Sequence, residues 1–304
     1  MKTTSERWVG LVPYLFVLIW SSGYVVAKYG LPYAEPLTFL SVRYGCVIVF
    51  MLVLAGLASA PWPDSPRRVL HIAVAGVLIQ AGYLGGVWCA IKLGMPAGVA
   101  ALIVNTQPIL TAIAGRTVGE RVRGWQWAGL FLGLAGVALV VSNKVSLIGM
   151  SWPAVGLAVL ALLSMTAGTL YQKRYCPSFD VRTGQVIQFA ASLAVTLPLA
   201  LAFETSQIDW NPHFFAALAW SVFILSGGGI SLLFIMIRHG AATRVTSYLY
   251  LVPPVTALMA WLMFGETFSL LACAGMALTV AAVALVVRSP DMPAAALQQA
   301  QKPR

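Results

Sequence analysis

Two stretches of the chain, 146 residues apart, carry the same pattern. Residues 119–141 read GERVRGWQWAGLFLGLAGVALVV, and residues 265–287 read GETFSLLACAGMALTVAAVALVV. Aligning 92–141 with 238–287 needs no gap and gives 15 identical pairs among 50. The preceding segments match at an offset of 145, in the pairs Gly23/Gly168, Lys28/Lys173, Pro32/Pro177, Glu35/Asp180 and Thr38/Thr183. The chain therefore contains two copies of one unit.

The composition indicates that this unit folds in lipid. Hydrophobic residues make up 60% of the chain, charged residues only 9%, and the mean hydropathy is +0.85. Soluble domains carry about 25% charged residues. A spanning helix needs about 20 mostly apolar residues, and continuous apolar runs favour helices over the alternating pattern of a β-barrel. The expected spans are 8–27, 37–58, 69–91, 96–116, 125–142, 153–172, 183–203, 214–236, 242–264 and 268–288.

These spans predict an all-α integral membrane protein with ten transmembrane helices. Each copy of the repeat, 1–145 and 146–290, holds five of them, and the tail 291–304 is expected to be disordered in the cytoplasm. Because five is odd, the second copy enters the membrane from the opposite side. Glu120 and its counterpart Glu266 are therefore expected on opposite faces. Inverted repeats of this kind recur in secondary transporters.

The basic residues predict the orientation. With the N-terminus inside, fifteen Lys and Arg residues fall on the cytoplasmic side, against Lys28, Lys92 and Lys144 outside. An excess of Lys and Arg on cytoplasmic loops sets membrane topology, so both termini are expected in the cytoplasm. The net charge of +10 is explained in this way, and no nucleic-acid partner is predicted.

The ordered set of motifs resembles a known family. Trp20-Ser21-Ser22-Gly23 lies late in the first helix, Arg43 early in the second, and Gly-Glu pairs stand at 119–120 and 265–266. In these features the chain is similar to the EamA-type branch of the drug/metabolite transporter superfamily. The resemblance implies a bacterial inner-membrane exporter of amino acids or other small metabolites. It also implies a cavity lined mainly by helices one, three, four, six, eight and nine.

Polar and aromatic residues within the spans are the candidates for lining that cavity, because polar groups deep in a membrane usually mark a functional pathway. Asn105 lies at mid-span, Gln80 and Tyr83 share one helix face, and Ser247 and Tyr250 share another. The substrate-binding candidates are Asn105, Gln80, Tyr83, Tyr250, Ser247, Trp20, Ser21, Ser22, Tyr171 and Ser226. This neutral, amide-bearing and aromatic set suits a small amphiphilic or zwitterionic solute.

Helix-bending positions and one buried cation complete the expectations. Pro108 and Pro254 are equivalent under the repeat, and a proline within a helix frees a carbonyl and bends the axis. Gly228 is expected to permit bending or close packing. Arg43 has two readings: its side chain reaches the outer headgroups, or it has an electrostatic role in the transport path. Its repeat partner is the neutral Gln188.

Other functions have less support in the sequence. Motifs for hydrolytic catalysis or phosphate binding are missing, so we expect neither an enzyme, a metal nor a cofactor. A flippase for a lipid or lipid-linked sugar in the same superfamily is the nearer alternative. Gly129-x₃-Gly133 favours close helix contact, and the sequence leaves open whether this serves helix ten or a homodimer.

Overall fold

The computed structural model is all-helical in the residues that it describes, which are 4–95, 100, 103–115, 122, 124–141, 151–239, 242–264 and 269–287. Glu120, Glu266 and the tail 291–304 lie outside these ranges. The only strand-like feature in them is an isolated bridge between Ala34 and Ile208. Five helices are long and apolar enough to cross a membrane: Pro36–Leu57, Pro66–Lys92, Trp152–Tyr175, Val181–Phe203 and Pro212–Arg238.

In the first half, the expected spans 37–58, 69–91 and 125–142 are helical over nearly the same residues, since long apolar runs must satisfy their backbone internally in lipid. The third span changes to a π-helical winding, η1, in its middle. The fourth is interrupted by a turn at Asn105–Thr106, which one residue separates from Pro108. The elements are α1 (Thr4–Gly30), α2 (Pro36–Leu57), α3 (Pro66–Gly76), η1 (Val77–Gly85), α4 (Gly86–Lys92), α6 (Gln107–Ala114) and α7 (Gly124–Val141).

The second half contains the corresponding irregularities. A π-helical segment, η4, occupies the middle of its third span, and a 3₁₀ turn, η5, interrupts its fourth. The elements are α8 (Trp152–Tyr175), α9 (Val181–Phe203), α10 (Pro212–Ala219), η4 (Trp220–Ile230), α11 (Ser231–His239), α12 (Ala242–Ser247), η5 (Tyr248–Leu251), α13 (Val252–Phe264) and α14 (Leu270–Val287). An offset of 145 carries η1 onto 222–230, almost the whole of η4.

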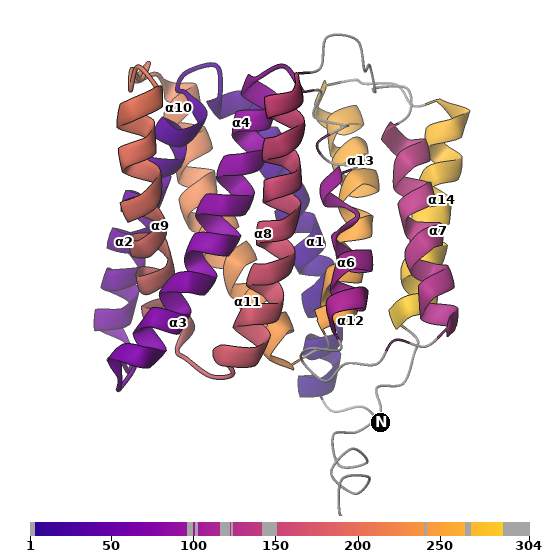
Figure 1. The fold of residues 1–304 in the computed structure, drawn as a ribbon, viewed down its shortest axis with the longest axis horizontal. Helices are drawn as coiled ribbons and strands as arrows, with labels where there is room; N and C mark the ends of the chain where they lie inside the picture. Colours follow the sequence, from indigo (N-terminus) through magenta and orange to yellow (C-terminus); the bar gives the residue numbers. More distant parts are fainter. Residues whose placement is uncertain are drawn as a thin grey trace, which may run out of the picture.

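The helices form one upright bundle (Figure 1). The pair α2 and α9 lies at one edge and the pair α7 and α14 at the other, each packed along its length. Between them, α1 packs on α10 and η4, while α8 packs on η1 and α4. Large apolar side chains such as Leu201, Leu262 and Leu270 are more than 60% exposed on the outside, as lipid-facing residues would be.

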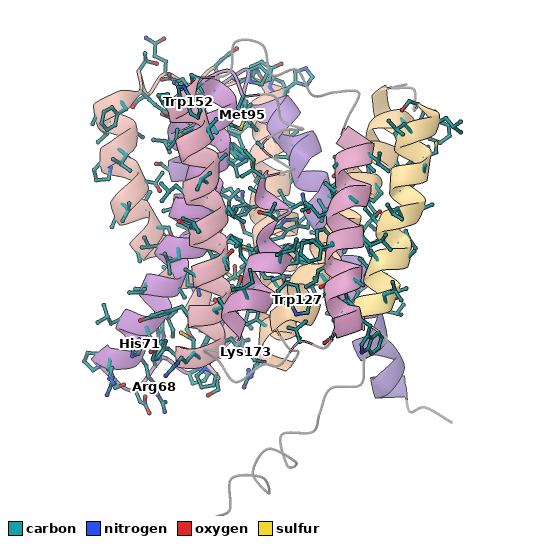
Figure 2. All side chains as sticks on the ribbon, turned by 45° about the vertical axis from the view of Figure 1, so that its right-hand side comes forward. Arg68, His71, Met95, Trp127, Trp152 and Lys173 are labelled. Carbon is teal, nitrogen blue, oxygen red and sulfur yellow. The ribbon has the colours of Figure 1, made fainter. Side chains whose placement is uncertain are left out.

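The two ends of the bundle differ in charge. Arg68, His71 and Lys173 lie at one end, and Met95 and Trp152 lie at the other (Figure 2). Lys92 belongs to the second end, because it pairs with Glu35 at the start of α2. The described basic side chains therefore concentrate at the end that holds Arg68.

Candidate functional site

Arg43 is a charged residue buried within the bundle. Helix α2 begins at Pro36, a favourable first helical residue, and Glu204 accepts hydrogen bonds from the backbone amides of Leu37 and Thr38 at 2.9 and 2.7 Å. Arg43 follows seven residues later, about 10 Å along the axis. Its side chain is only 3% exposed, so this arginine lies inside the protein.

Ser226 in η4 is the hydrogen-bond partner of that guanidinium. Arg43 Nε and Nη2 donate to Ser226 Oγ at 3.1 and 3.0 Å. In the part of the chain that the structure describes, no carboxylate forms an ion pair with Arg43. The serine oxygen orients the guanidinium, and no described carboxylate compensates its charge.

Arg43 forms one wall of a cavity of about 70 Å³. Apart from Arg43, most of the lining is aromatic or aliphatic and comes from α1, η1, α4 and η4. The lining residues are Trp20, Gly23, Arg43, Tyr83, Leu84, Val87, Trp88, Ile91, Leu225 and Ile230. Three predicted residues, Trp20, Arg43 and Tyr83, thus meet at one cavity, with Ser226 bonded to one of them.

The two π-helical segments supply two of these residues. Tyr83 is part of η1 and Ser226 is part of η4. Single π-helical turns within α-helices occur frequently at functional sites, because the extra residue re-aims the side chains that follow. Both segments contribute residues to the surroundings of Arg43, which favours a site at this point.

Gln80 and Tyr250 lie in the core without lining this cavity. Both are completely buried, and neither the Gln80 amide nor the Tyr250 hydroxyl has a hydrogen-bond partner among the described residues. The Tyr250 ring packs directly on Gly133, where an added Cβ would lie 2.6 Å from its Cδ2 atom. The Tyr44 hydroxyl donates to the backbone carbonyl of Gln80 at 3.0 Å. Buried polar groups without partners are costly, so both side chains have unused binding capacity.

Ser21 and Ser22 connect α1 to its neighbours. Ser21 Oγ donates to the Val252 carbonyl at 3.4 Å. Ser22 Oγ donates to the Ile19 carbonyl at 2.6 Å and accepts from Trp220 Nε1 at 2.9 Å. These two hydroxyls are therefore used in helix contacts in this conformation.

Asn105 and Ser247 stand at the two helix interruptions. Asn105 is 6% exposed in the turn before α6, and Ser247 is completely buried at the end of α12. The elements α6 and α12 pack against each other. Pro108 lies in the first turn of α6, and Pro254 lies early in α13. Both prolines thus follow a break in the helix, which is a larger departure than the bend predicted from the sequence.

Tyr171 and Gly228 lie elsewhere. Tyr171 shares a 2.7 Å hydrogen bond with His71 Nδ1 at the basic end of the bundle and does not line the cavity beside Arg43. Cavities of about 160 and 410 Å³ open at that end, both lined by Cys176, Phe179 and Arg238. Gly228 lies against Ile19 at an ordinary van der Waals distance of 3.5 Å for an added Cβ, so close packing does not require a glycine there.

Sequence reasoning missed Trp88 and Leu225 as cavity residues. The spacing of Tyr83, Val87 and Ile91 at intervals of four places them on one helix face, with Trp88 adjacent. That periodicity extends the predicted Gln80/Tyr83 face, and it was the sequence signal that could have identified these cavity residues. Nothing in the local sequence indicates that η4 would meet the same space.

Comparison with known proteins assigns the family. The EamA-like transporter family model matches residues 7–142 and 152–288. An uncharacterized inner membrane transporter, YedA of Escherichia coli K12, is 29% identical over 274 residues, covering 88% of this chain and 87% of YedA. A probable amino-acid metabolite efflux pump of Salmonella typhimurium is 24% identical, covering 90% of this chain and 92% of the pump.

A solved crystal structure has the same fold. It superposes with a TM-score of 0.78 at 18% identity and covers 91% of this chain and 96% of its own. The family match extends over nearly all of the chain and agrees with its apolar helices. The chain therefore belongs to the EamA-like transporter family and is a membrane transporter.

Proposed function

We propose that the protein is an inner-membrane secondary exporter of amino acids or similar small amphiphilic or zwitterionic metabolites. In this proposal it works by alternating access between two inverted five-helix halves. The relatives named as an inner membrane transporter and as a probable amino-acid metabolite efflux pump support the location and the substrate class. The basic end with Arg68 and Lys173 faces the cytoplasm, since Lys and Arg favour that side.

The reciprocal packing of the two halves is the observation that carries this proposal. Under the repeat, α2 corresponds to α9 and α7 to α14, and each of these pairs packs together. The contact of α1 with α10 and η4 has its counterpart in the contact of α8 with α3 and η1. Matching contacts of this kind are expected of halves related by a two-fold axis in the membrane plane. Such halves can interchange conformations and so open one central site to each side in turn.

Breaks at equivalent positions give further support. The π-helical segments correspond, and the turn at Asn105–Thr106 corresponds to the junction of η5 and α13. Discontinuous helices in matching positions of the two halves commonly form the binding site of transporters. We therefore assign solute contact at the centre to Asn105 and Tyr250.

An export assay tests this function. Proteoliposomes containing the purified protein are loaded with a panel of amino acids and related metabolites, and efflux is followed for wild type, Asn105→Ala and Tyr250→Phe. The phenylalanine variant keeps the ring on Gly133 and removes only the unpaired hydroxyl. Loss of one hydrogen bond to the solute is expected to lower efflux about tenfold.

Tyr14→Phe is the control, because Tyr14 is 58% exposed on the outside of the bundle. It should transport at the wild-type rate. No efflux of any panel member by the wild-type protein would contradict the transporter assignment to this substrate class. Equal efflux by wild type and both central variants would contradict the site.

A further inference from the structure

The geometry points to Arg43 as the anchor for the carboxylate of the transported solute, and hence to small monocarboxylates with an apolar body as the substrate class. This inference rests on the proposed transport function and narrows it. In this inference the carboxylate binds in the cavity of about 70 Å³ where Trp20, Tyr83 and Trp88 face the same space as the guanidinium, a cavity that Asn105 and Tyr250 do not line.

The first argument is the uncompensated charge. A buried cation costs several kcal/mol unless an anion pairs with it. Arg43 is 3% exposed, and its hydrogen bonds within the described residues go to one neutral oxygen, Ser226 Oγ. These bonds use Nε and Nη2 and fix the plane of the guanidinium. Arginine presents its donors as a rigid fork that matches a carboxylate, so the solute can supply the missing anion.

The second argument is that the fold itself does not require this cation. The repeat-equivalent position in α9 is Gln188, which is also completely buried. Gln188 donates to Gln172 Oε1 at 3.0 Å and packs beside Gly76. A neutral amide therefore serves helix packing at the equivalent place. The charge at Arg43 is an addition to one half only, as expected for a binding group.

The third argument comes from the size and lining of the cavity. A water molecule needs about 10–15 Å³ of such cavity volume, so the space of about 70 Å³ holds roughly five water molecules. That is enough for a carboxylate with a short apolar body. Leu225 and Ile230 are apolar, and none of the described lining residues is acidic. The aromatic faces of Trp20, Tyr83 and Trp88 accommodate an ammonium group on the solute without requiring one.

A binding experiment with the purified full-length protein tests the recognition. The probes are L-valine, 3-methylbutanoate and L-valinamide, which share a branched body and differ in their charged groups. Titration calorimetry is expected to detect valine and 3-methylbutanoate and to give at least a tenfold weaker affinity for valinamide. This comparison uses only wild type, so it holds whether or not a variant folds.

Variants then assign the recognition to Arg43. Arg43→Gln should weaken binding of 3-methylbutanoate about tenfold to a hundredfold, the range expected for lost charge-assisted hydrogen bonds. Arg43→Lys keeps the charge but loses the forked arrangement of donors, so its affinity for 3-methylbutanoate should lie between those of wild type and Arg43→Gln. Arg68→Gln is the matched control, because Arg68 is exposed and pairs with Asp64 at the surface. It should bind as wild type does.

Efflux of the same probes separates this inference from the transport function. Export of valine by wild type and not by Arg43→Gln supports both. Export of valinamide as fast as valine, unchanged valine export by Arg43→Gln, or displacement of 3-methylbutanoate by chloride at equal concentration overturns the carboxylate anchor while transport stands. Export of none of the panel and none of these probes by wild type contradicts the transport function and the anchor together.

Discussion

The two halves of this molecule differ more in single side chains than in the arrangement of their helices. Arg43 and Gln188 occupy equivalent positions, and both are buried, yet one brings a charge to a cavity and the other bonds to a neighbouring amide. Two repeat copies can therefore keep similar packing while only one of them supplies a charged group. In the proposed mechanism, such a residue determines which part of the centre binds the solute.

The carboxylates at the helix starts are more similar in the two halves. Glu35 and Asp180 occupy equivalent N-cap positions, but only the Asp180 carboxylate accepts a hydrogen bond from its own helix, whereas Glu35 accepts from Lys92 and Thr205. Asp180 accepts from the Arg182 amide at 2.9 Å and from its guanidinium at 2.7 Å. The Arg182 side chain holds the pKa of Asp180 below its usual value. The charged form of Asp180 therefore stabilises the folded state.

This shift predicts a pH-dependent stability. Because the folded-state pKa is lowered, the stabilisation is fully present above the ordinary aspartate pKa and is lost as pH falls through the folded-state value. Asp180→Asn keeps a capping side chain and removes the charge. It should melt below wild type at about pH 7, and the difference should shrink as the pH falls below the ordinary aspartate pKa of about 4.

Thermal melting in detergent across that pH range is the measurement. Asp64→Asn provides the control, since it removes an exposed ion pair with Arg68 and surface pairs contribute little. A melting difference for Asp180→Asn that stays the same from neutral to acid pH would rule out a charge effect at this cap.

At the scale of helices, the pair α7 and α14 depends on small residues. An added Cβ at Gly275 would lie 2.6 Å from the Gly136 carbonyl oxygen and 2.7 Å from the Val140 amide. Gly129 meets Ala282 and Val286 in the same interface. The small residues of α7 therefore serve packing within the chain, which the sequence left undecided.

Gly275→Val should separate this pair. Overpacking of a close contact typically costs about 1–3 kcal/mol, so the variant should melt several degrees below wild type or accumulate poorly in the membrane. Ala274→Val adds the same type of side chain at an exposed neighbouring position and should melt as wild type does. Equal melting of the two variants would show that the two helices do not meet at Gly275.

The helices were predictable from the sequence because lipid forces long apolar segments to satisfy their own hydrogen bonds. Segments such as 37–58 and 183–203 differ from α2 and α9 by only one or two residues at their ends. The π-helical segments η1 and η4 were not predictable, because their apolar composition is the same as that of an α-helix. Their winding depends on neighbours that are distant in the sequence.

The candidate site was predictable residue by residue but not as a whole. Trp20, Arg43 and Tyr83 stand out as polar or aromatic groups in apolar spans, and they do share a cavity. Tyr171 stands out equally, yet it pairs with His71 at the basic end. Which of these residues share one space depends on how α1, α2 and the third span pack together, and no local pattern encodes that packing.

At the scale of the whole molecule, the proposal requires that the space beside Arg43 opens to each side of the membrane in turn. Leu225 lines that space and is 7% exposed. A cysteine at this position therefore reports which side reaches the centre. Asp64 and Asp209 correspond under the 145-residue offset and serve as markers of the two faces.

Labelling of Leu225→Cys by a membrane-impermeant thiol reagent is the most direct test. The variant is made after Cys46, Cys89, Cys176 and Cys273 have been replaced, and right-side-out and inside-out vesicles are compared. Alternating access between inverted halves predicts labelling of Leu225→Cys from both sides, while Asp64→Cys and Asp209→Cys each react from one side, and from opposite sides. Labelling of Leu225→Cys from a single side, or of both aspartate positions from the same side, would contradict it.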